Sequence, residues 1–271
     1  MKLTNKVALV LGAVKGIGRA IALALARQGV KLAVTYYDWD EEFSKLKEEL
    51  KKTGVEYLIL KQNLLETESI PIMVKRVADK FGGIDILLNN IERGGWPVVH
   101  GKYIKEQWDL EFETTLRAKW WVFDSVLSYL KNSKDGVVIN FSSIAGIVGR
   151  SGPASLVFND GYAAANRGVL SLTETFARLG APYVRVNEIM LGIFDTRHGL
   201  GTRGWSLLKE DQKKAILDHI LLKRTGSFDD IIKAVLFIIR DAPYMTGSVI
   251  RLDGGYVLAG ETVCNMPEGV V

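Results

Sequence analysis

The sequence predicts an α/β fold, a doubly wound parallel sheet of about seven strands in a single domain spanning residues 1–271. Two observations lead to this prediction. The first is a series of short segments rich in Val, Ile and Leu. The second is that these segments alternate with longer ones whose apolar residues recur at helical spacing. Continuous apolar runs are typical of strands buried on both faces, and strict alternation favours parallel crossovers with helices on both sides of the sheet. No Pro-rich or Gly/Ser-rich linker divides the chain.

Each expected element follows from its own residues. Short runs of β-branched and aliphatic residues predict strands at 6–12, 31–37, 56–61, 85–90, 136–143, 183–190 and 247–255. Amphipathic patterns predict helices at 17–29, 41–53, 69–80, 105–131, 162–179 and 228–240. The highly charged segment 41–53 belongs to this series as a helix with a solvated outer face that ends at Gly54.

Composition argues against several classes of protein. The net charge of +4 is mild, and no Lys/Arg run is interleaved with aromatic residues, so we expect no nucleic-acid partner. One cysteine, Cys264, excludes an internal disulfide framework and suits a reducing compartment. We find no signal peptide and no unbroken apolar run of about 18 residues, and the histidines are too scattered for a metal site. We therefore expect a cytoplasmic protein with no bound metal and no membrane partner.

A glycine-rich turn follows the first expected strand. The segment "VLGAVKGIGRAIALALARQG" places Gly12, Gly16 and Gly18 before a helix whose apolar stripe starts at Ile17. Backbone N–H groups at such a helix start form an anion site, and glycine permits close approach of a pyrophosphate. In a chain of parallel-sheet units, this pattern favours a dinucleotide site over a plain turn. We expect all three glycines and Ile17 at that site.

The end of the second expected strand bears on the choice of dinucleotide. An acid at this point would bind the free 2′-hydroxyl of a ribose. The sequence instead has Tyr36 and Tyr37, with Asp38 just beyond. Lys15, inside the glycine turn, is well placed to meet a 2′-phosphate. We therefore expect NADP, contacted by Lys15 and Tyr36, and Asp38 keeps NAD open as the alternative.

Two segments interrupt the alternation, 91–103 and 191–212, and both follow the carboxyl end of a strand, where open parallel sheets bind ligands. Glycines surround Trp205 in the second segment. This composition predicts a substrate lid at about 191–212 with an apolar tip. A plain surface loop with an incidental tryptophan is the alternative. Trp96 and Trp205 are candidate apolar walls of a substrate pocket.

Several motifs together resemble one family. "LGAVKGIG", "DILLNN", "VVINFSSIAG", "YAAAN", "VRVNEIMLGIFDT" and "MTGSVIRLDGG" stand in the order and approximate spacing of the short-chain dehydrogenases/reductases. The resemblance runs from residue 5 to about 258. It implies a Rossmann-like fold, a nicotinamide dinucleotide cofactor, and a homotetramer or homodimer built partly on the long helices after strands four and five.

The resemblance also implies roles for individual residues. Tyr162 matches the family's general acid or base, and Ser143 matches the serine that holds the substrate oxygen. Thr196 matches the threonine that holds the nicotinamide carboxamide. Asn89 matches the asparagine that braces the central sheet, and we expect the adjacent Asn90 at the cofactor. At the adenine end, the position of the family's usual acid is occupied by Asn63.

Two catalytic positions depart from the family pattern. Asn166 stands where a lysine would bind the nicotinamide ribose and lower the pKa of the tyrosine, and Thr115 stands where an asparagine would anchor a relay water. A unit charge at about 4 Å is worth about 4 kcal/mol at an effective dielectric of about 20. Its loss would therefore cost about two to three orders of magnitude in rate. Lys119 and Arg167, the candidate substitute cations, are interpreted as surface or interface charges. 

Other departures surround the cofactor site. Ile91 and Glu92 replace two small residues, and Leu191 replaces a proline. Glu92 is either part of a different proton relay or a solvent-facing carboxylate, and the second interpretation is favoured. A neutral tyrosine can still donate a proton to a carbonyl as hydride arrives, so reduction suffers less than oxidation.

Three functions remain open. The first is an NAD(P)-dependent oxidoreductase that reduces a small carbonyl substrate, or acts on the corresponding alcohol, with altered proton delivery. The second is a non-catalytic dinucleotide-binding sensor or structural subunit. The third is a non-redox reaction such as dehydration. The presence of both Ser143 and Tyr162 favours the enzyme.

Overall fold

In the part of the chain that the structure describes, seven strands lie parallel in one sheet, in the order β3-β2-β1-β4-β5-β6-β7. The structure is a computed structural model that describes residues 1–91, 105–196, 205, 208–261, 263, 266 and 269. The strands are β1 (Val7–Val10), β2 (Lys31–Tyr36), β3 (Tyr57–Lys61), β4 (Ile86–Asn89), β5 (Gly136–Ser143), β6 (Val184–Leu191) and β7 (Val249–Leu252). This sheet confirms the predicted Rossmann-like, doubly wound fold.

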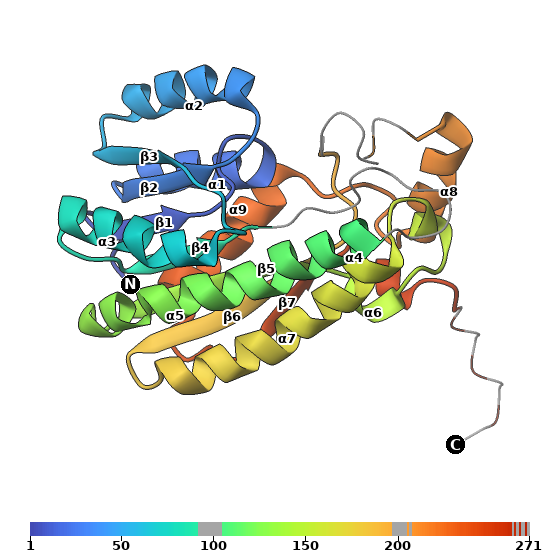
Figure 1. Cartoon of the computed structure of the whole chain (residues 1–271). Helices are drawn as coiled ribbons and strands as arrows, with labels where there is room; N and C mark the ends of the chain where they lie inside the picture. Colours follow the sequence, from blue (N-terminus) through green and yellow to red (C-terminus); the bar gives the residue numbers. More distant parts are fainter. Residues whose placement is uncertain are drawn as a thin grey trace.

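Helices cover both faces of the sheet (Figure 1). One apolar layer joins the sheet to α1 (Gly16–Arg27), α2 (Asp40–Thr53) and α9 (Phe228–Leu236). The opposite layer joins it to α3 (Ile70–Phe81), α5 (Ala118–Asn132) and α7 (Asp160–Gly180). In that second layer Phe123 of α5 stacks on Phe176 of α7 with ring centroids 3.8 Å apart. Burial on both faces is the physical reason that the strands are continuously apolar.

The strand order reverses direction at β1, which pairs with β2 on one side and with β4 on the other. In open parallel sheets, ligands bind outside the carboxyl ends of the strands at such a switch point. The glycine turn leaves the carboxyl end of β1, and Asn90 and Ile91 leave the carboxyl end of β4. The topology therefore brings these segments to one edge of the sheet.

The predicted helix at 105–131 is interrupted in the structure. It consists of α4 (Lys105–Phe112), a π-helical turn at Glu113–Arg117, and α5. A π-helical turn inserts one extra residue, which rotates the preceding side chains relative to the following ones by about 100°. Two short helices, α6 (Ala145–Val148) and α8 (Glu210–His219), lie in segments where no helix was predicted.

Part of the predicted lid at about 191–212 lies outside the described residues, since 197–204, 206 and 207 are not among them. The same holds for Glu92 and Trp96. Within the ranges that are described, no helix is both long enough and apolar enough to span a bilayer.

Candidate active site and cofactor cleft

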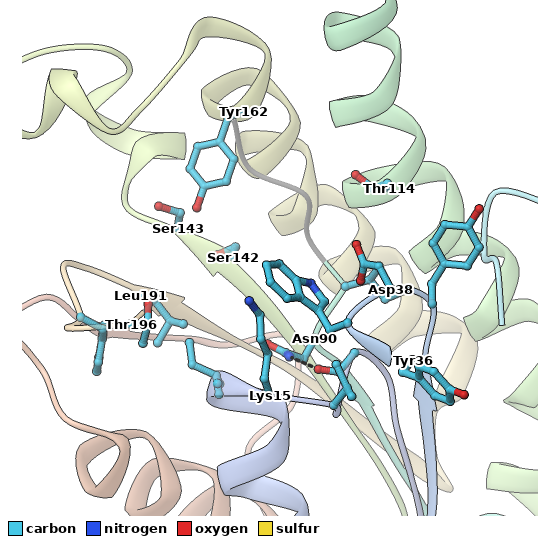
Figure 2. A pocket seen from close by; sticks show the side chains of 18 of the residues that line it. Lys15, Tyr36, Asp38, Asn90, Thr114, Ser142, Ser143, Tyr162, Leu191 and Thr196 are labelled. Carbon is cyan, nitrogen blue, oxygen red and sulfur yellow. Dashed lines mark hydrogen bonds between the residues drawn. The ribbon is translucent and has the colours of Figure 1, made fainter. Parts of the chain in front are cut away.

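A cavity of about 560 Å³ opens at the carboxyl edge of the sheet. Its walls come from the segments after β1 to β6, from the turn at Glu113–Arg117 and from the start of α7. Figure 2 shows residues of this wall. Of the residues predicted from sequence to form the site, those in the wall are Gly12, Lys15, Gly16, Ile17, Tyr36, Asn63, Asn90, Ser143, Tyr162, Thr196 and Trp205. Gly18, Thr115 and Asn166 are not in the wall.

The glycine turn packs tightly against the end of β4. Gly12 has a φ of +64°, and a Cβ atom there would lie 2.7 Å from the Asn90 carbonyl oxygen. Gly18 stands behind the wall, where a Cβ atom would overlap the Gly12 carbonyl oxygen. Gly16 faces open space, with nothing within 4 Å of a Cβ atom. The first turn of α1 contains no acidic residue. The N–H groups at a helix start have no partner within the helix, and together with this open space they fit a dinucleotide pyrophosphate.

Aromatic side chains surround the end of β2. The Lys15 ammonium lies 2.9 Å from the centroid of the Trp39 ring, and Tyr36 stacks on Phe43 at 5.1 Å. Trp39, which lines the cavity, adopts a left-handed backbone with φ of +69° just before α2. Asn63 is held by its own turn, where its side-chain oxygen accepts from the Leu65 N–H at 3.1 Å.

Tyr162 is positioned by the cap of its helix. The side chain of Asn159 caps α7 by accepting from the Tyr162 N–H at 2.7 Å, and it donates to Glu111 Oε1 at 3.1 Å. Ser143, at the end of β5, is buried, and its Oγ accepts from the Ala145 N–H at 3.2 Å. The Tyr162 hydroxyl points toward this end of β5 (Figure 2). A phenol and a serine hydroxyl therefore face the same part of the cavity as groups able to bind a carbonyl oxygen.

Comparison with known sequences agrees with this geometry. A family model described as enoyl-(acyl carrier protein) reductase matches residues 12–257. The chain belongs to the short-chain dehydrogenase/reductase family. A 3-oxoacyl-(acyl-carrier-protein) reductase from Staphylococcus epidermidis is 33% identical, over 93% of this chain and 98% of the relative. One of the same name from Thermotoga maritima is 31% identical, over 95% of this chain and 100% of the relative.

Solved structures of this short-chain dehydrogenase/reductase family share the fold. A short-chain alcohol dehydrogenase candidate from Sinorhizobium meliloti 1021 superimposes with a TM-score of 0.81 at 28% identity, covering 94% of this chain and 98% of the other. A mutant short-chain dehydrogenase/reductase from Serratia marcescens has the same TM-score of 0.81 at 23% identity, covering 94% and 99%. Members of this family carry a nicotinamide dinucleotide, and the cleft described above fits one.

The two departures from the family's catalytic pattern lie behind the wall. Asn166 is fully buried, and its amide donates to the Tyr162 carbonyl at 3.0 Å, one turn back along α7. Thr115 is also fully buried, and its hydroxyl has no hydrogen-bond partner within the described residues. Thr114 lines the cavity instead. The π-helical turn at Glu113–Arg117 accounts for this difference, because it changes which side chain of the helix faces the cleft.

Lys119 is not the surface charge predicted from the sequence. It is 0% exposed, and its ammonium donates to the carbonyl of Ile91, which lines the cavity. The prediction was wrong because the π-helical turn and the packing of α5 against the sheet turn this position inward. Arg167 is exposed, as expected.

A buried polar network lies under the cavity floor. Ser142 lines the cavity, and its hydroxyl donates to Oε1 of Glu188, which is 0% exposed. Thr173 donates to Glu188 Oε2 at 3.4 Å and accepts from the Asn140 amide at 3.0 Å. Asn140 accepts from the Asn89 amide at 3.2 Å, which joins β4 to β5. The network therefore runs from the cavity into the core of the sheet.

Burial raises the pKa of the Glu188 carboxyl above its ordinary value, because a carboxylate loses its hydration there. The hydroxyls of Ser142 and Thr173 and the positive charges of Lys119 and Arg167 oppose this shift by favouring the ionised form. The environment thus holds the carboxyl in a protonated form over a wider pH range than in water while leaving partners for the ionised form.

Among the polar and aromatic residues that sequence reasoning missed at this site are Thr114, Trp39, Ser142 and Glu188. The sequence did contain one signal for Glu188, namely a charged residue inside a run that is otherwise apolar. Glu188 stands in the middle of "VRVNEIML", and Lys119 stands in the same way in "AKWWVF". Charged residues are almost never fully buried unless they are paired. Two charges inside core elements therefore already suggest a functional pair.

Proposed function

We propose that the protein is an NADP-preferring oxidoreductase that reduces a small carbonyl substrate. The observation that carries this proposal is that a single cavity contains the glycine turn at one end and the Tyr162–Ser143 pair at the other. The names of the curated relatives make 3-oxoacyl thioesters the first substrates to assay. We also propose a cytoplasmic location and NAD as the weaker cofactor.

The chemistry divides between cofactor and chain. When bound, the nicotinamide supplies the hydride. Ser143 holds the carbonyl oxygen by hydrogen bonding, and Tyr162 donates a proton to that oxygen as negative charge develops on it. Thr196 is proposed to hold the carboxamide, and the N–H groups at the start of α1 the pyrophosphate. A substrate carbonyl in this position becomes an alcohol.

Cofactor choice is tested at Lys15. We expect Lys15→Met to weaken NADPH binding about 10- to 100-fold, because a charge-assisted bond to a phosphate is worth about 1.5–3 kcal/mol. NADH binding should change little. Titration followed by nicotinamide fluorescence measures both, with Lys31→Met as the matched control at the other end of β2. Equal losses for NADPH and NADH would refute the role of Lys15 at a 2′-phosphate.

A non-catalytic sensor is the second candidate, and one observation favours it. Asn166 places a neutral, fully buried amide where the family has a cation. The same titrations, followed by assays on 3-oxoacyl thioesters and simple ketones, distinguish the candidates. NADPH binding without turnover of any carbonyl would favour the sensor.

We further propose a homodimer or homotetramer that uses the outer face of α4 and α5. Trp120 and Trp121 are each 39% exposed there and line a shallow groove with Phe112 and Leu116. Burying such aromatic residues at a subunit contact stabilises it strongly. The double variant Trp120→Glu/Trp121→Glu is expected to sediment as a monomer in analytical ultracentrifugation. Ile72→Glu, an exposed apolar position on α3, is the control and should leave the assembly intact.

A further inference from the structure

The buried carboxyl under the cavity floor has a direct link to the site. Glu188 lies on β6 opposite Asn140 of β5, and Ser142 follows two residues later on the same face. Ser142 contacts both Glu188 and the cavity. The Tyr162 hydroxyl points toward the end of β5 that carries Ser142 and Ser143 (Figure 2). Ser142 therefore lies between the cavity that Tyr162 lines and the buried carboxyl.

The surroundings of Glu188 suit a group that gives up and regains a proton. Asn140 and Ser142 face it from β5, Thr173 from α7, and Val249 pairs with it from β7. The charged groups acting on it are Lys119 of α5, which is fully buried, and Arg167 of α7, which is exposed. Burial favours the neutral carboxyl, and the two cations and two hydroxyls limit the cost of ionisation.

We propose that Glu188 is a proton store that acts on the active site through the hydroxyl of Ser142. The proposal rests on the reductase function proposed above. Tyr162 gives its proton to the substrate oxygen while hydride forms the new C–H bond. The Ser142 hydroxyl, which donates to Glu188 in the structure, then turns to pass its proton to the phenolate. The protonated Glu188 carboxyl in turn donates its own proton to the Ser142 oxygen. The Glu188 carboxylate regains a proton from water when the product leaves.

Hydride and protons balance over these transfers. One hydride and one proton convert the carbonyl to an alcohol, and one proton taken from solvent restores the Glu188 carboxyl. The proton store also bears on the neutral residue at position 166. A lysine there would keep the phenolate stable between turnovers, whereas a neighbouring acid removes the phenolate by protonating it. Proton transfer from a carboxyl to a phenolate is favourable because the ordinary pKa of tyrosine, about 10, lies far above that of glutamate.

A titration that needs no turnover tests the store. In protein labelled with ¹³C at the glutamate side-chain carboxyl, the Glu188 signal is identified by its loss in Glu188→Gln. We expect it to titrate above the other glutamates, and to move higher still in Lys119→Met because that variant removes a stabilising cation. Titration together with the other glutamates would overturn the proposal, whatever the activity.

Kinetics test the link to the site. We expect Glu188→Gln to lower kcat at least about tenfold with the NADPH dissociation constant unchanged, and to abolish the decline in kcat as pH rises through the Glu188 pKa. Ser142→Ala should have the same effect, and the double variant should add no further loss. Asp85→Asn, a carboxylate bonded to Lys6 at the opposite edge of the sheet, is the control. Ser142→Ala carries the test alone should Glu188→Gln not fold.

The possible failures are distinguishable. A high Glu188 pKa with kcat and pH profile unchanged in both variants overturns the proton store and leaves the reductase standing. A wild-type protein that binds NADPH and reduces no carbonyl refutes the reductase and the store together. In that case the titration describes only a buried structural glutamate.

Discussion

Replacing Tyr162 with phenylalanine should lower kcat/KM for carbonyl reduction by about 10²- to 10⁴-fold while NADPH binds as before. The phenol is the direct proton donor in the proposed reaction, and its ring is held by packing that the variant keeps. Tyr162 stacks on Phe158 with ring centroids 6.1 Å apart, and its backbone N–H is bound by Asn159. Loss of the hydroxyl therefore removes the donor without moving the helix.

Steady-state kinetics on a 3-oxoacyl thioester, with NADPH affinity measured by fluorescence, checks this expectation. Tyr183→Phe is the matched control, because Tyr183 is 49% exposed and lies at the amino end of β6, away from the cavity. A Tyr162→Phe enzyme with unimpaired kcat/KM would refute the tyrosine mechanism. The Ser142–Glu188 pair would then be tested as the direct proton source by combining Tyr162→Phe with Ser142→Ala.

Gly18→Ala should reduce the free energy of unfolding by about 1–3 kcal/mol and weaken NADPH binding more than about tenfold. The added methyl group would overlap the Gly12 carbonyl oxygen and lie 2.8 Å from the Asn90 amide nitrogen. Because the Gly12 carbonyl belongs to the backbone, it cannot move aside at low cost. The clash would instead push α1 away from β4 and displace the N–H groups proposed to hold the pyrophosphate.

Urea unfolding and NADPH titration measure the two effects. Gly83→Ala is the control, since its backbone needs no left-handed φ and a Cβ atom there would have nothing within 4 Å. Equal stability of the Gly18 and Gly83 variants would show that the turn tolerates a wider separation of α1 from the sheet.

Most of the fold was accessible from local patterns. The predicted strand at 136–143 coincides with β5, and the one at 31–37 differs from β2 by a single residue. Apolar runs report burial directly, so strands buried on both faces are easy to recognise. Helix α6 was missed because four residues are too few to show a periodicity, and α8 because Ile216 is its one buried residue, which leaves no clear apolar stripe.

The residues of the candidate site likewise fall into those that local motifs predicted and those that they did not. Motifs that stand next to each other along the chain, such as the glycine turn and the helix start at Tyr162, were recognised as units. Thr114 was missed in favour of Thr115 because no residue pattern announced the π-helical turn. A shift of one residue in a helix turns a side chain by about 100°, which is enough to exchange a wall residue for a buried one.

The sequence by itself determined the doubly wound sheet and the glycine turn, because each depends on periodicity or on residues close along the chain, and the family resemblance alone indicated Ser143 and Tyr162. Only the tertiary structure decided that Lys119 is buried, that Ser142 contacts both the cavity and Glu188, and that Asn166 is turned onto its own helix. The burial and the contacts of these side chains depend on which helices and strands pack together. Lys119, Ser142 and Glu188 lie on α5, β5 and β6, and the electrostatics of the core arise only when those elements meet.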